Sequence, residues 1–286
     1  MSPNERADEP PIALSIAGLD PSGGAGVLAD VRTFAAFQCF PTAVITSITF
    51  QNTTGVSGAL HQSGETVRSQ VLPIIADFSI AGVKTGMLPT REVIVEVARL
   101  FRETNLPAPV VDPVMRATSG DDLINDDAVG SLVSDLFPQA AVVTPNIPEA
   151  ERLTGLTIKD EESMREAARS IRELGARAVL VKGGHMLSAR QEANDDARER
   201  ETEAIDILDE NGAVTVFRAE LIRGGEIHGS GCTLSAAIAA CLARWMNLQE
   251  AVETAKQFIT AAIKNAPAIG HGARPLFGVR WQADED

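Results

Sequence analysis

Short apolar runs that resemble buried strands alternate with amphipathic helical segments along most of the chain. An apolar run at 11–18 precedes helical periodicity over 23–37, and a second run at 43–50 precedes a helical segment at 64–78. Continuous apolar runs are typical of strands that are covered on both faces. Strands that alternate with helix-length segments pair in parallel through crossover helices. The alternation therefore predicts an α/β fold with a central, mostly parallel sheet between two layers of helices.

The same alternation continues towards the C-terminus, with one change of pattern. Residues 203–217 predict a β-hairpin, because an Asn-Gly pair at 211–212 supplies the turn. The charged run at 188–203 predicts a solvated loop, and residues 1–10 predict a disordered tail before a single domain at 11–280. Further strands are expected at 80–87, 109–115, 140–146 and 176–184, and further helices at 91–104, 126–137, 162–175, 232–245 and 249–266.

The composition argues against several classes of protein. The 286 residues carry a formal net charge of −14 with no basic patch, which argues against a nucleic-acid partner. The sequence contains no apolar run of 18 residues and no apolar leader segment, so we expect neither a membrane span nor a signal peptide. Cys39, Cys232 and Cys241 lack metal-binding or paired spacing, which favours a reducing, cytoplasmic location. The acidity favours adaptation to high salt.

Polar sequences follow the predicted strands at their carboxyl ends. In open α/β sheets, ligands bind beyond these ends of the strands. Seven such junctions therefore predict one shared binding site. They read GLDPSGGAG, QNTTG, KTGM, DPVMRATSG, TPNIPEAE, KGGH and HGSGC.

The last of these junctions, at residues 228–232, opens an almost wholly apolar helix. The backbone N–H groups of Gly229, Ser230, Gly231 and Cys232 are expected to point out of the helix start, at the positive end of its dipole. Such an arrangement binds anions such as phosphate, although a tight loop into a core helix is the alternative. A cysteine at this place is expected to have a lowered pKa and to act as a base or nucleophile, unless it is only a small packing residue.

Three other junctions carry charged or amide side chains. Asn146 and Glu149 lie three residues apart at a helix start, where they either hold hydrated Mg²⁺ beside phosphates or form a helix-capping box. Asp112 ends a buried strand, where a carboxylate is costly unless it faces a charge or forms an Asp-Pro turn. Lys182 either reaches a nucleotide phosphate or extends to solvent.

The N-terminal junctions predict contacts with a flat ligand. The glycines of 18–26 allow a backbone wall, and the Gln51 amide offers a donor and an acceptor to a heterocycle edge, unless it is ordinary loop polarity. Met87 forms an apolar lid or packs in the core, and Asp30 faces either the site or solvent. Two histidines lie near the predicted site without metal-ligand spacing, His185 and His228.

In order, the motifs resemble those of the hydroxymethylpyrimidine/phosphomethylpyrimidine kinases of thiamine biosynthesis, which belong to the ribokinase-like superfamily. The resemblance covers residues 11–265 and rests on GLDPSGGAG…ADVRTF, ITSITFQNTTGV, KTGML, VVDPVM…SG, TPNIPEAE, VLVKGGH and HGSGCTLSAAIAA. It implies a ribokinase-like three-layer fold, a homodimer, ATP with Mg²⁺, and two successive phosphorylations of 4-amino-5-hydroxymethyl-2-methylpyrimidine. Some members carry an additional C-terminal phosphate synthase domain, and because nothing of domain size follows the kinase motifs here, we expect a chain with the kinase function alone.

The resemblance also assigns roles to residues. The phosphoryl cradle is Gly229, Ser230 and Gly231, with Cys232 where many sugar kinases of the superfamily carry an aspartate base. Ser230 departs from the commoner HGTGC motif but keeps the hydroxyl. A pyridoxal/pyridoxine kinase is the alternative activity, and a pyrimidine-binding sensor without catalysis is a third. We assign Gly18, Asp30, Gln51, Met87 and Val114 to the pyrimidine, Lys182, Asn146, Glu149 and Asp112 to ATP, and Glu149 to the metal ion.

Overall fold

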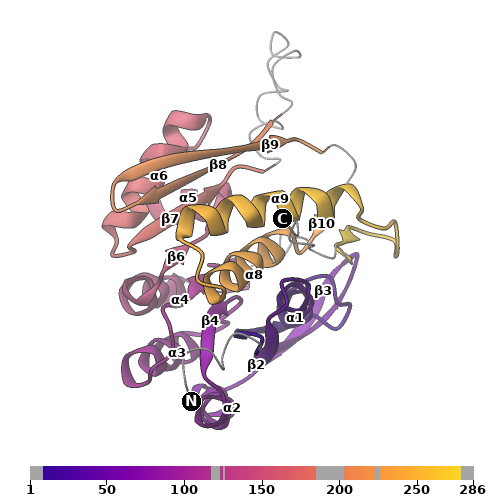
Figure 1. Ribbon diagram of the computed structural model, residues 1–286, viewed down its shortest axis with the longest axis vertical. Coiled ribbons are helices and arrows are strands. Elements are labelled where there is room, and N and C mark those ends of the chain that lie inside the picture. The colour runs from indigo at the N-terminus through magenta and orange to yellow at the C-terminus, as the bar shows by residue number, and fades with distance from the viewer. Residues whose placement is uncertain (1–8, 117–122, 125, 185–202, 223–225, 278–286) are drawn as a thin grey trace.

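The computed structural model describes residues 9–116, 123–124, 126–184, 203–222 and 226–277 (Figure 1). These residues form a sheet with the strand order β3-β2-β1-β4-β5-β6-β7-β8-β9. The strands are β1 (Ile12–Leu19), β2 (Phe40–Asn52), β3 (Gly55–His61), β4 (Ile80–Thr85), β5 (Val110–Val111), β6 (Val142–Val143), β7 (Ala178–Lys182), β8 (Glu203–Glu210) and β9 (Ala213–Glu220).

The middle of the sheet is parallel and its two edges are antiparallel. Strand β1 pairs in parallel with β2 and β4, and the parallel order continues through β5, β6 and β7. The hairpin strands β3, β8 and β9 pair antiparallel. Asn211 and Gly212 turn between β8 and β9 with φ of 52° and 91°, as the Asn-Gly pair predicts. The prediction of a mostly parallel sheet is therefore confirmed.

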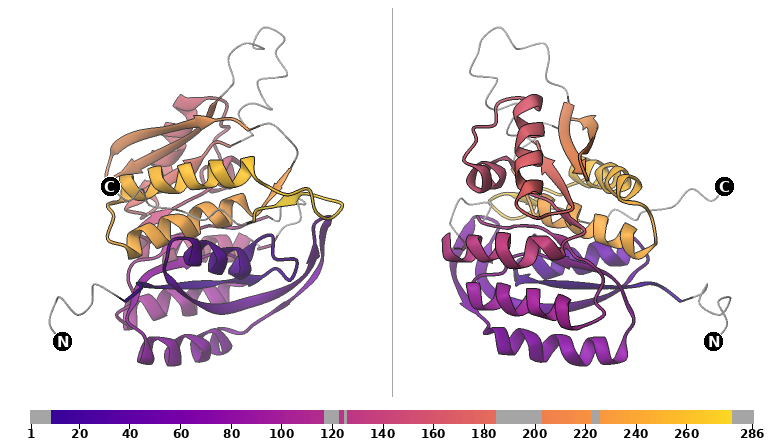
Figure 2. Two further views of the ribbon diagram at one scale, coloured as in Figure 1. Left: turned by 45° about the vertical axis from the view of Figure 1, so that its right-hand side comes forward. Right: turned by 90° about the vertical axis from the view of Figure 1, so that its left-hand side faces the viewer.

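Helices cover both faces of the sheet (Figure 2). On one face lie α1 (Gly26–Ala36), α8 (Ser230–Ala243) and α9 (Leu248–Lys264). The other face carries α2 (Gly64–Asp77), α3 (Arg91–Glu103), α4 (Asp126–Ser131), α5 (Ile147–Thr154) and α6 (Glu161–Glu173). Successive strand residues enter different cores, since Ala13 packs with the α1 side and Leu14 with the α2 side. This explains why the strand sequences are apolar without alternation.

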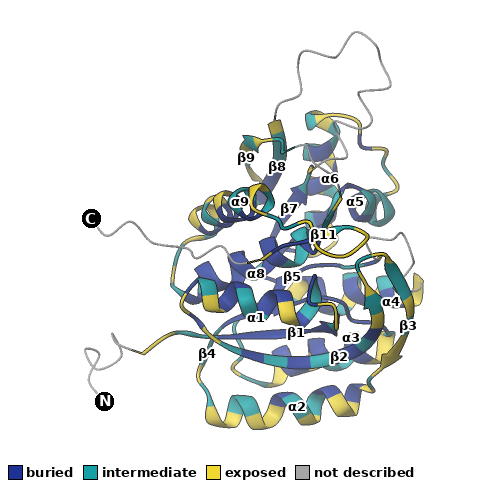
Figure 3. Ribbon diagram, turned by 90° about the vertical axis from the view of Figure 1, so that its right-hand side faces the viewer, coloured by how far each residue is buried: buried dark blue, intermediate teal, exposed yellow. Residues whose placement is uncertain are grey.

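Helix α8 is apolar on all sides because neighbours surround it (Figure 3). It packs between the sheet and α9, and α1 lies against it as well. Its residues from Thr233 to Cys241 are all buried. A short parallel pair, β10 (Ile227–His228) with β11 (Arg274–Pro275), holds the chain directly before this helix. The strand pair before the helix and the packing around the helix together fix the position of the helix start.

Some predicted elements differ from the observed ones. The QNTTG segment is the turn of a hairpin between β2 and β3, and the sequence analysis missed β3. The single helix expected at 126–137 is α4 followed by a π-helical turn at Leu132–Leu136 and a 3₁₀ turn at Phe137–Gln139. Pro138 contributes to this ending, because a proline has no N–H with which to continue the helical hydrogen bonds. Residues 1–8 of the predicted tail and most of the charged run, up to residue 202, lie outside the described residues.

Two findings concern membranes and cysteines. Within the described residues, no helix combines the length and the apolar character that crossing a membrane requires. Cys39, Cys232 and Cys241 are free thiols.

Candidate active site

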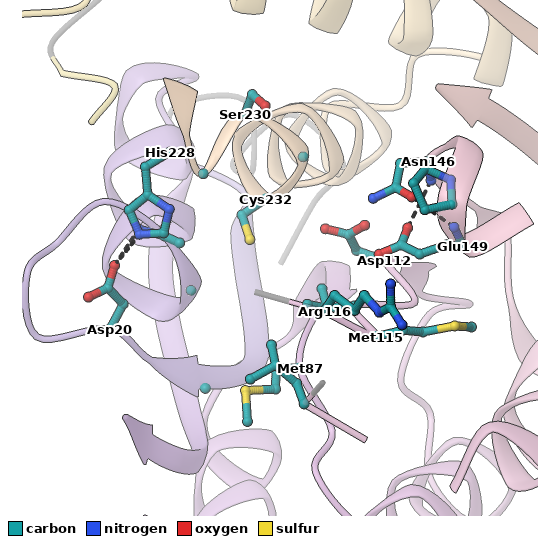
Figure 4. Close-up of a pocket in the computed structure, with 18 of the residues that line it drawn as sticks. Asp20, Met87, Asp112, Met115, Arg116, Asn146, Glu149, His228, Ser230 and Cys232 are labelled. Atoms are coloured by element: carbon teal, nitrogen blue, oxygen red, sulfur yellow. Dashed lines mark hydrogen bonds and ion pairs between the residues drawn. The ribbon is translucent and has the colours of Figure 1, made fainter. Parts of the chain in front are cut away.

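A cavity of about 930 Å³ lies at the carboxyl ends of the parallel strands (Figure 4). Its wall combines residues from β1, β2 and β7 with the loops after β4 and β5 and the starts of α5 and α8. The cavity therefore lies where the seven polar junctions predict it. Twelve of the thirteen predicted site residues line it: Gly18, Gln51, Met87, Asp112, Val114, Asn146, Glu149, Lys182, Gly229, Ser230, Gly231 and Cys232.

The first turn of α8 lines this cavity, and no described side chain caps its backbone N–H groups. Gly229 is the N-cap residue, with φ of 79°, and no side chain caps the helix. A Cβ on Gly229 would lie 1.9 Å from the carbonyl oxygen of Gly24, so only glycine fits at this left-handed position. The first turn also contains no acidic side chain. The positive end of the helix dipole therefore faces the cavity with no acidic side chain from its own first turn, which suits an anion.

A lysine ammonium lies next to this helix start. Lys182 Nζ is 2.9 Å from Asp112 Oδ1, and both side chains are almost fully buried. A Cβ on Gly231 would lie only 3.1 Å from the same Nζ, so the missing side chain lets the ammonium approach the helix. Burial lowers the pKa of Lys182, but the carboxylates of Asp112 and Glu149 outweigh it and raise the pKa overall. The lysine is therefore charged, and two sources of positive potential meet at one wall of the cavity.

Glu149 forms a capping box with Asn146, which is one of the two alternatives from the sequence analysis. Asn146 Oδ1 accepts from the Glu149 N–H at 2.9 Å, and Glu149 Oε2 accepts from the Asn146 N–H at 2.8 Å. Burial, opposed by Lys182 and reinforced by Asp112, raises the pKa of Glu149 to about 7. The Lys182 ammonium therefore does not fully offset the burial of this carboxylate and the charge of Asp112.

The chemistry of these acidic groups fits a hydrated cation. In the described part of the chain, no cluster of three or more His, Cys, Asp or Glu side chains is placed to hold a metal ion alone. Mg²⁺ needs no such cluster, because it keeps several waters and takes one or two carboxylates together with substrate phosphates. Glu149 and Asp112, two buried carboxylates that both line the cavity, match that requirement.

Cys232 departs from the sequence prediction in its pKa. The residue lines the cavity as predicted. However, burial raises the pKa of its thiol to about 11, although Lys84 acts in the opposite direction. The predicted lowering of this pKa is therefore wrong, because removal from water costs the thiolate more than nearby positive groups return.

Asp30 lies behind the cavity rather than in its wall. Its carboxylate oxygens are 2.8 and 2.9 Å from Lys84 Nζ, and Ser15 Oγ donates to it at 2.6 Å. Both charged side chains are fully buried. The structure therefore separates Asp30 from the other predicted pyrimidine contacts. Its partner Lys84 was not singled out, although a lysine inside the apolar run at 80–85 signals a buried charge pair.

Asp20 and His228 form a second polar pair in the wall. His228 Nε2 lies 2.8 Å from Asp20 Oδ2 and 3.0 Å from Gln51 Nε2 (Figure 4 draws the first contact). Asp20 also accepts from Ser22 and from the Ala25 N–H, which orders the glycine-rich loop. The sequence analysis missed Asp20, whose Asp-Pro-Ser-Gly context is a turn signal. It also missed Met115 and Arg116 in the wall, and His185 lies outside the described residues.

Comparisons with known proteins agree with this architecture. A kinase from Rhizobium meliloti named hydroxymethylpyrimidine/phosphomethylpyrimidine kinase is 44% identical over 277 residues, which cover 96% of this chain and 99% of that protein. A thiamine biosynthesis bifunctional protein from Geobacter sulfurreducens is 44% identical over 92% of this chain. The chain spans only 51% of that bifunctional protein.

Solved structures show the same fold. The ADP complex of Bacillus subtilis pyridoxal kinase superposes with a TM-score of 0.82 at 34% identity, covering 93% of this chain and 96% of that one. Phosphomethylpyrimidine kinase from Clostridium difficile superposes with a TM-score of 0.74 at 37% identity, covering 88% and 99%. The fold is ribokinase-like, as predicted. The model of the family described as phosphomethylpyrimidine kinase matches residues 20–277. The chain therefore belongs to the phosphomethylpyrimidine kinase family.

Proposed function

We propose that this chain transfers a phosphoryl group from ATP to the hydroxymethyl oxygen of 4-amino-5-hydroxymethyl-2-methylpyrimidine, and then a second one to the monophosphate. The main supporting observation is the convergence of the uncapped α8 start and the Lys182 ammonium on one wall of the cavity. The names of the family and of the Rhizobium relative support the same activity.

Phosphoryl transfer depends mainly on positioning and on neutralising charge. The N–H groups from Gly229 to Cys232 would hold the transferring group, and Lys182 would face a nucleotide phosphate across Gly231. Donors that point at developing charge contribute about 10²–10³ in rate when they are removed singly. Glu149 and Asp112 would hold Mg²⁺, which supplies positive charge to the phosphates when it is bound.

The direct test is mass spectrometry of the products after incubation with the hydroxymethylpyrimidine and Mg-ATP. The proposal expects masses for both the monophosphate and the diphosphate of the pyrimidine. Unchanged substrate with intact ATP would reject the kinase activity. Binding of the pyrimidine without any phosphorylated product would instead favour the sensor hypothesis.

A pyridoxal kinase is the second candidate, because pyridoxal kinases are among the structures that superpose with a TM-score of 0.82. The Gln51 amide in the cavity wall favours the aminopyrimidine, whose N–C–NH₂ edge accepts and donates one hydrogen bond each. Comparing kcat/KM for the two substrates separates these activities. A larger value for pyridoxal would reverse our assignment.

Gln51→Leu is expected to weaken pyrimidine binding by about 1–3 kcal/mol, because the ring edge loses its hydrogen-bond partners on burial. Isothermal titration calorimetry with the wild-type and variant chains measures this change. The unfolding transition should stay cooperative, since Gln51 is only half-buried at the end of β2. An unchanged affinity would remove Gln51 from the binding site.

Glu149→Gln is expected to raise the Mg²⁺ concentration needed for half-maximal activity, with pyrimidine affinity unchanged. A hard cation prefers a carboxylate oxygen over an amide oxygen. The glutamine retains an oxygen for the Asn146 N–H, so the helix cap survives. Activity titrations against Mg²⁺ measure the shift. If the Mg²⁺ requirement stays the same, Glu149 serves only the capping box.

We also propose that the chain works as a homodimer in the cytoplasm and tolerates high salt, on the basis of the family resemblance, the unpaired cysteine spacing and the net charge of −14. Light scattering in buffers of rising salt tests the dimer and the salt tolerance together. A monomer, or precipitation at high salt, would contradict them.

A further inference from the structure

The side-chain amide of Gln51 lies between two polar neighbours. Its Nε2 is 3.0 Å from His228 Nε2, and its Oε1 is 3.1 Å from Thr49 Oγ1. The oxygen and nitrogen of an amide are similar in size, so hydrogen-bond partners decide which atom occupies which place. Both neighbours of Gln51 have other partners, and these restrict the amide.

On the first side, His228 must act as a donor. Its Nε2 is 2.8 Å from Asp20 Oδ2, a carboxylate that also accepts from Ser22 and from the Ala25 N–H. Burial opposes ionisation, but the hydrogen bonds from His228 and Ser22 outweigh it and lower the pKa of Asp20. An ionised carboxylate only accepts, so Nε2 carries the proton. A protonated Nε2 cannot accept a hydrogen bond from an amide nitrogen. It must face the carbonyl oxygen of Gln51.

On the second side, the Thr49 hydroxyl accommodates this orientation by acting as an acceptor. Its hydroxyl lies 3.1 Å from the backbone carbonyl oxygen of Leu19, which can only accept. The single hydroxyl proton can go to Leu19 or, at the same distance of 3.1 Å, to the atom of Gln51 that faces it. When it goes to Leu19, the lone pairs of Oγ1 face Gln51 and accept from the amide nitrogen. The orientation that His228 demands is thus also satisfied at Thr49, and it reverses the assignment of the two amide atoms.

We infer that Asp20, His228 and Thr49 lock the Gln51 amide with its oxygen toward His228 and its nitrogen toward Thr49, and so select a ring edge with an acceptor nitrogen beside an amine donor. The identity of the ring rests on the proposed function. His228 and Thr49 are thus positioning residues that act through Gln51. The lock makes the order of donor and acceptor in the site a fixed property of the ligand-free protein.

The lock also directs the ring. The exocyclic amine of the aminopyrimidine would face the amide oxygen on the His228 side, and the ring nitrogen would face the amide nitrogen on the Thr49 side. The hydroxymethyl group is attached next to the amine-bearing carbon, so it lies on the His228 side as well. His228 directly precedes Gly229 and the start of α8 (Figure 4). The reacting oxygen is therefore turned toward the proposed phosphoryl cradle.

Two nearly isosteric rings test this inference. In the 4-oxo analogue, 5-hydroxymethyl-2-methylpyrimidin-4-one, the ring nitrogen donates and the exocyclic oxygen accepts. A locked amide would then face donor against donor and acceptor against acceptor. Calorimetry without nucleotide is expected to show at least about 100-fold tighter binding of the amino ring, since mismatched polar groups stay unpaired on burial. Equal binding of both rings by the wild-type chain would overturn the inference.

Substitutions of Thr49 and His228 test whether these residues cause the preference for the amino ring. Thr49→Val removes the acceptor and is expected to reduce the preference for the amino ring about tenfold. His228→Gln retains an N–H donor for Asp20 and should keep the preference within about threefold. Thr42→Val is the matched control, because its hydroxyl donates to the Ala13 carbonyl oxygen earlier on the same strand. A preference that is identical in Thr49→Val and Thr42→Val would reject the role of Thr49.

A measurement on the wild-type chain does not depend on how the variants fold. Nuclear Overhauser effects from the Gln51 amide protons should reach the Thr49 methyl group and be weaker to the His228 ring. The opposite pattern would overturn the inference. The proposed function is judged separately, by product formation. A chain that prefers the amino ring but forms no phosphorylated product would refute the function and keep the lock.

Discussion

Lys84→Met is expected to lower the free energy of unfolding by about 3–5 kcal/mol, because it leaves a carboxylate buried without its counter-charge. Lys84 Nζ lies 2.8 and 2.9 Å from the two carboxylate oxygens of Asp30, and neither side chain has any solvent exposure. Methionine fills similar space without the charge, so only the Ser15 hydroxyl would remain bonded to Asp30. Guanidinium denaturation at neutral pH measures the loss.

Two controls identify the cause of this loss. The double variant Lys84→Met with Asp30→Leu replaces both charges by apolar groups and should recover most of the stability. Lys264→Met removes a lysine from an ion pair with Glu220 that is half exposed, and should change the free energy of unfolding by less than about 1 kcal/mol. If Lys84→Met is no more harmful than Lys264→Met, the buried pair contributes nothing to stability.

This buried pair marks the limit of what the sequence predicts about the fold. Parallel strands and crossover helices follow from apolar periodicity, which is a local property, and the structure confirms them. The contact between Asp30 and Lys84 joins α1 to β4 across 54 residues, and nothing in either local sequence specifies the other. The edge strand β3 was missed for a related reason. Its glycines and polar residues give little apolar signal, and it is a strand because β2 supplies a partner.

For the site, the location can be predicted from the sequence but the electrostatic properties cannot. Its location follows from topology, because carboxyl ends of parallel strands meet at one edge. Twelve predicted residues therefore reach the cavity wall. Electrostatic properties do not follow in this way. The pKa of Cys232 depends on burial in the folded chain, and burial opposes the helix dipole that the sequence made visible. The role of His228 similarly depends on Asp20, which is 208 residues away.

Cys232→Ala is expected to reduce kcat about 10²-fold or more, if the thiolate accepts the proton of the hydroxymethyl group. The backbone N–H groups and the pyrimidine contacts remain, so KM should change little. The raised pKa of the thiol, about 11, adds a second signature. At pH 7 only about one thiol in 10⁴ is ionised, and this fraction grows about tenfold per pH unit below the pKa. Wild-type kcat should therefore rise between pH 7 and 9.5, and the alanine variant should lack this rise.

Cys232→Asp separates the base from the packing of the side chain. The superfamily resemblance places an aspartate at this position, and a carboxylate is expected to ionise at a lower pH than the thiol. We expect this variant to recover part of the lost rate and to show a flat pH profile over the same range. Alkylation of Cys232 should be slow at neutral pH, because the buried thiol is protonated. If the alanine variant keeps a normal kcat and the wild type has a flat profile, Cys232 is a packing residue. The backbone from Gly229 to Gly231 would then be the whole contribution of this loop to catalysis.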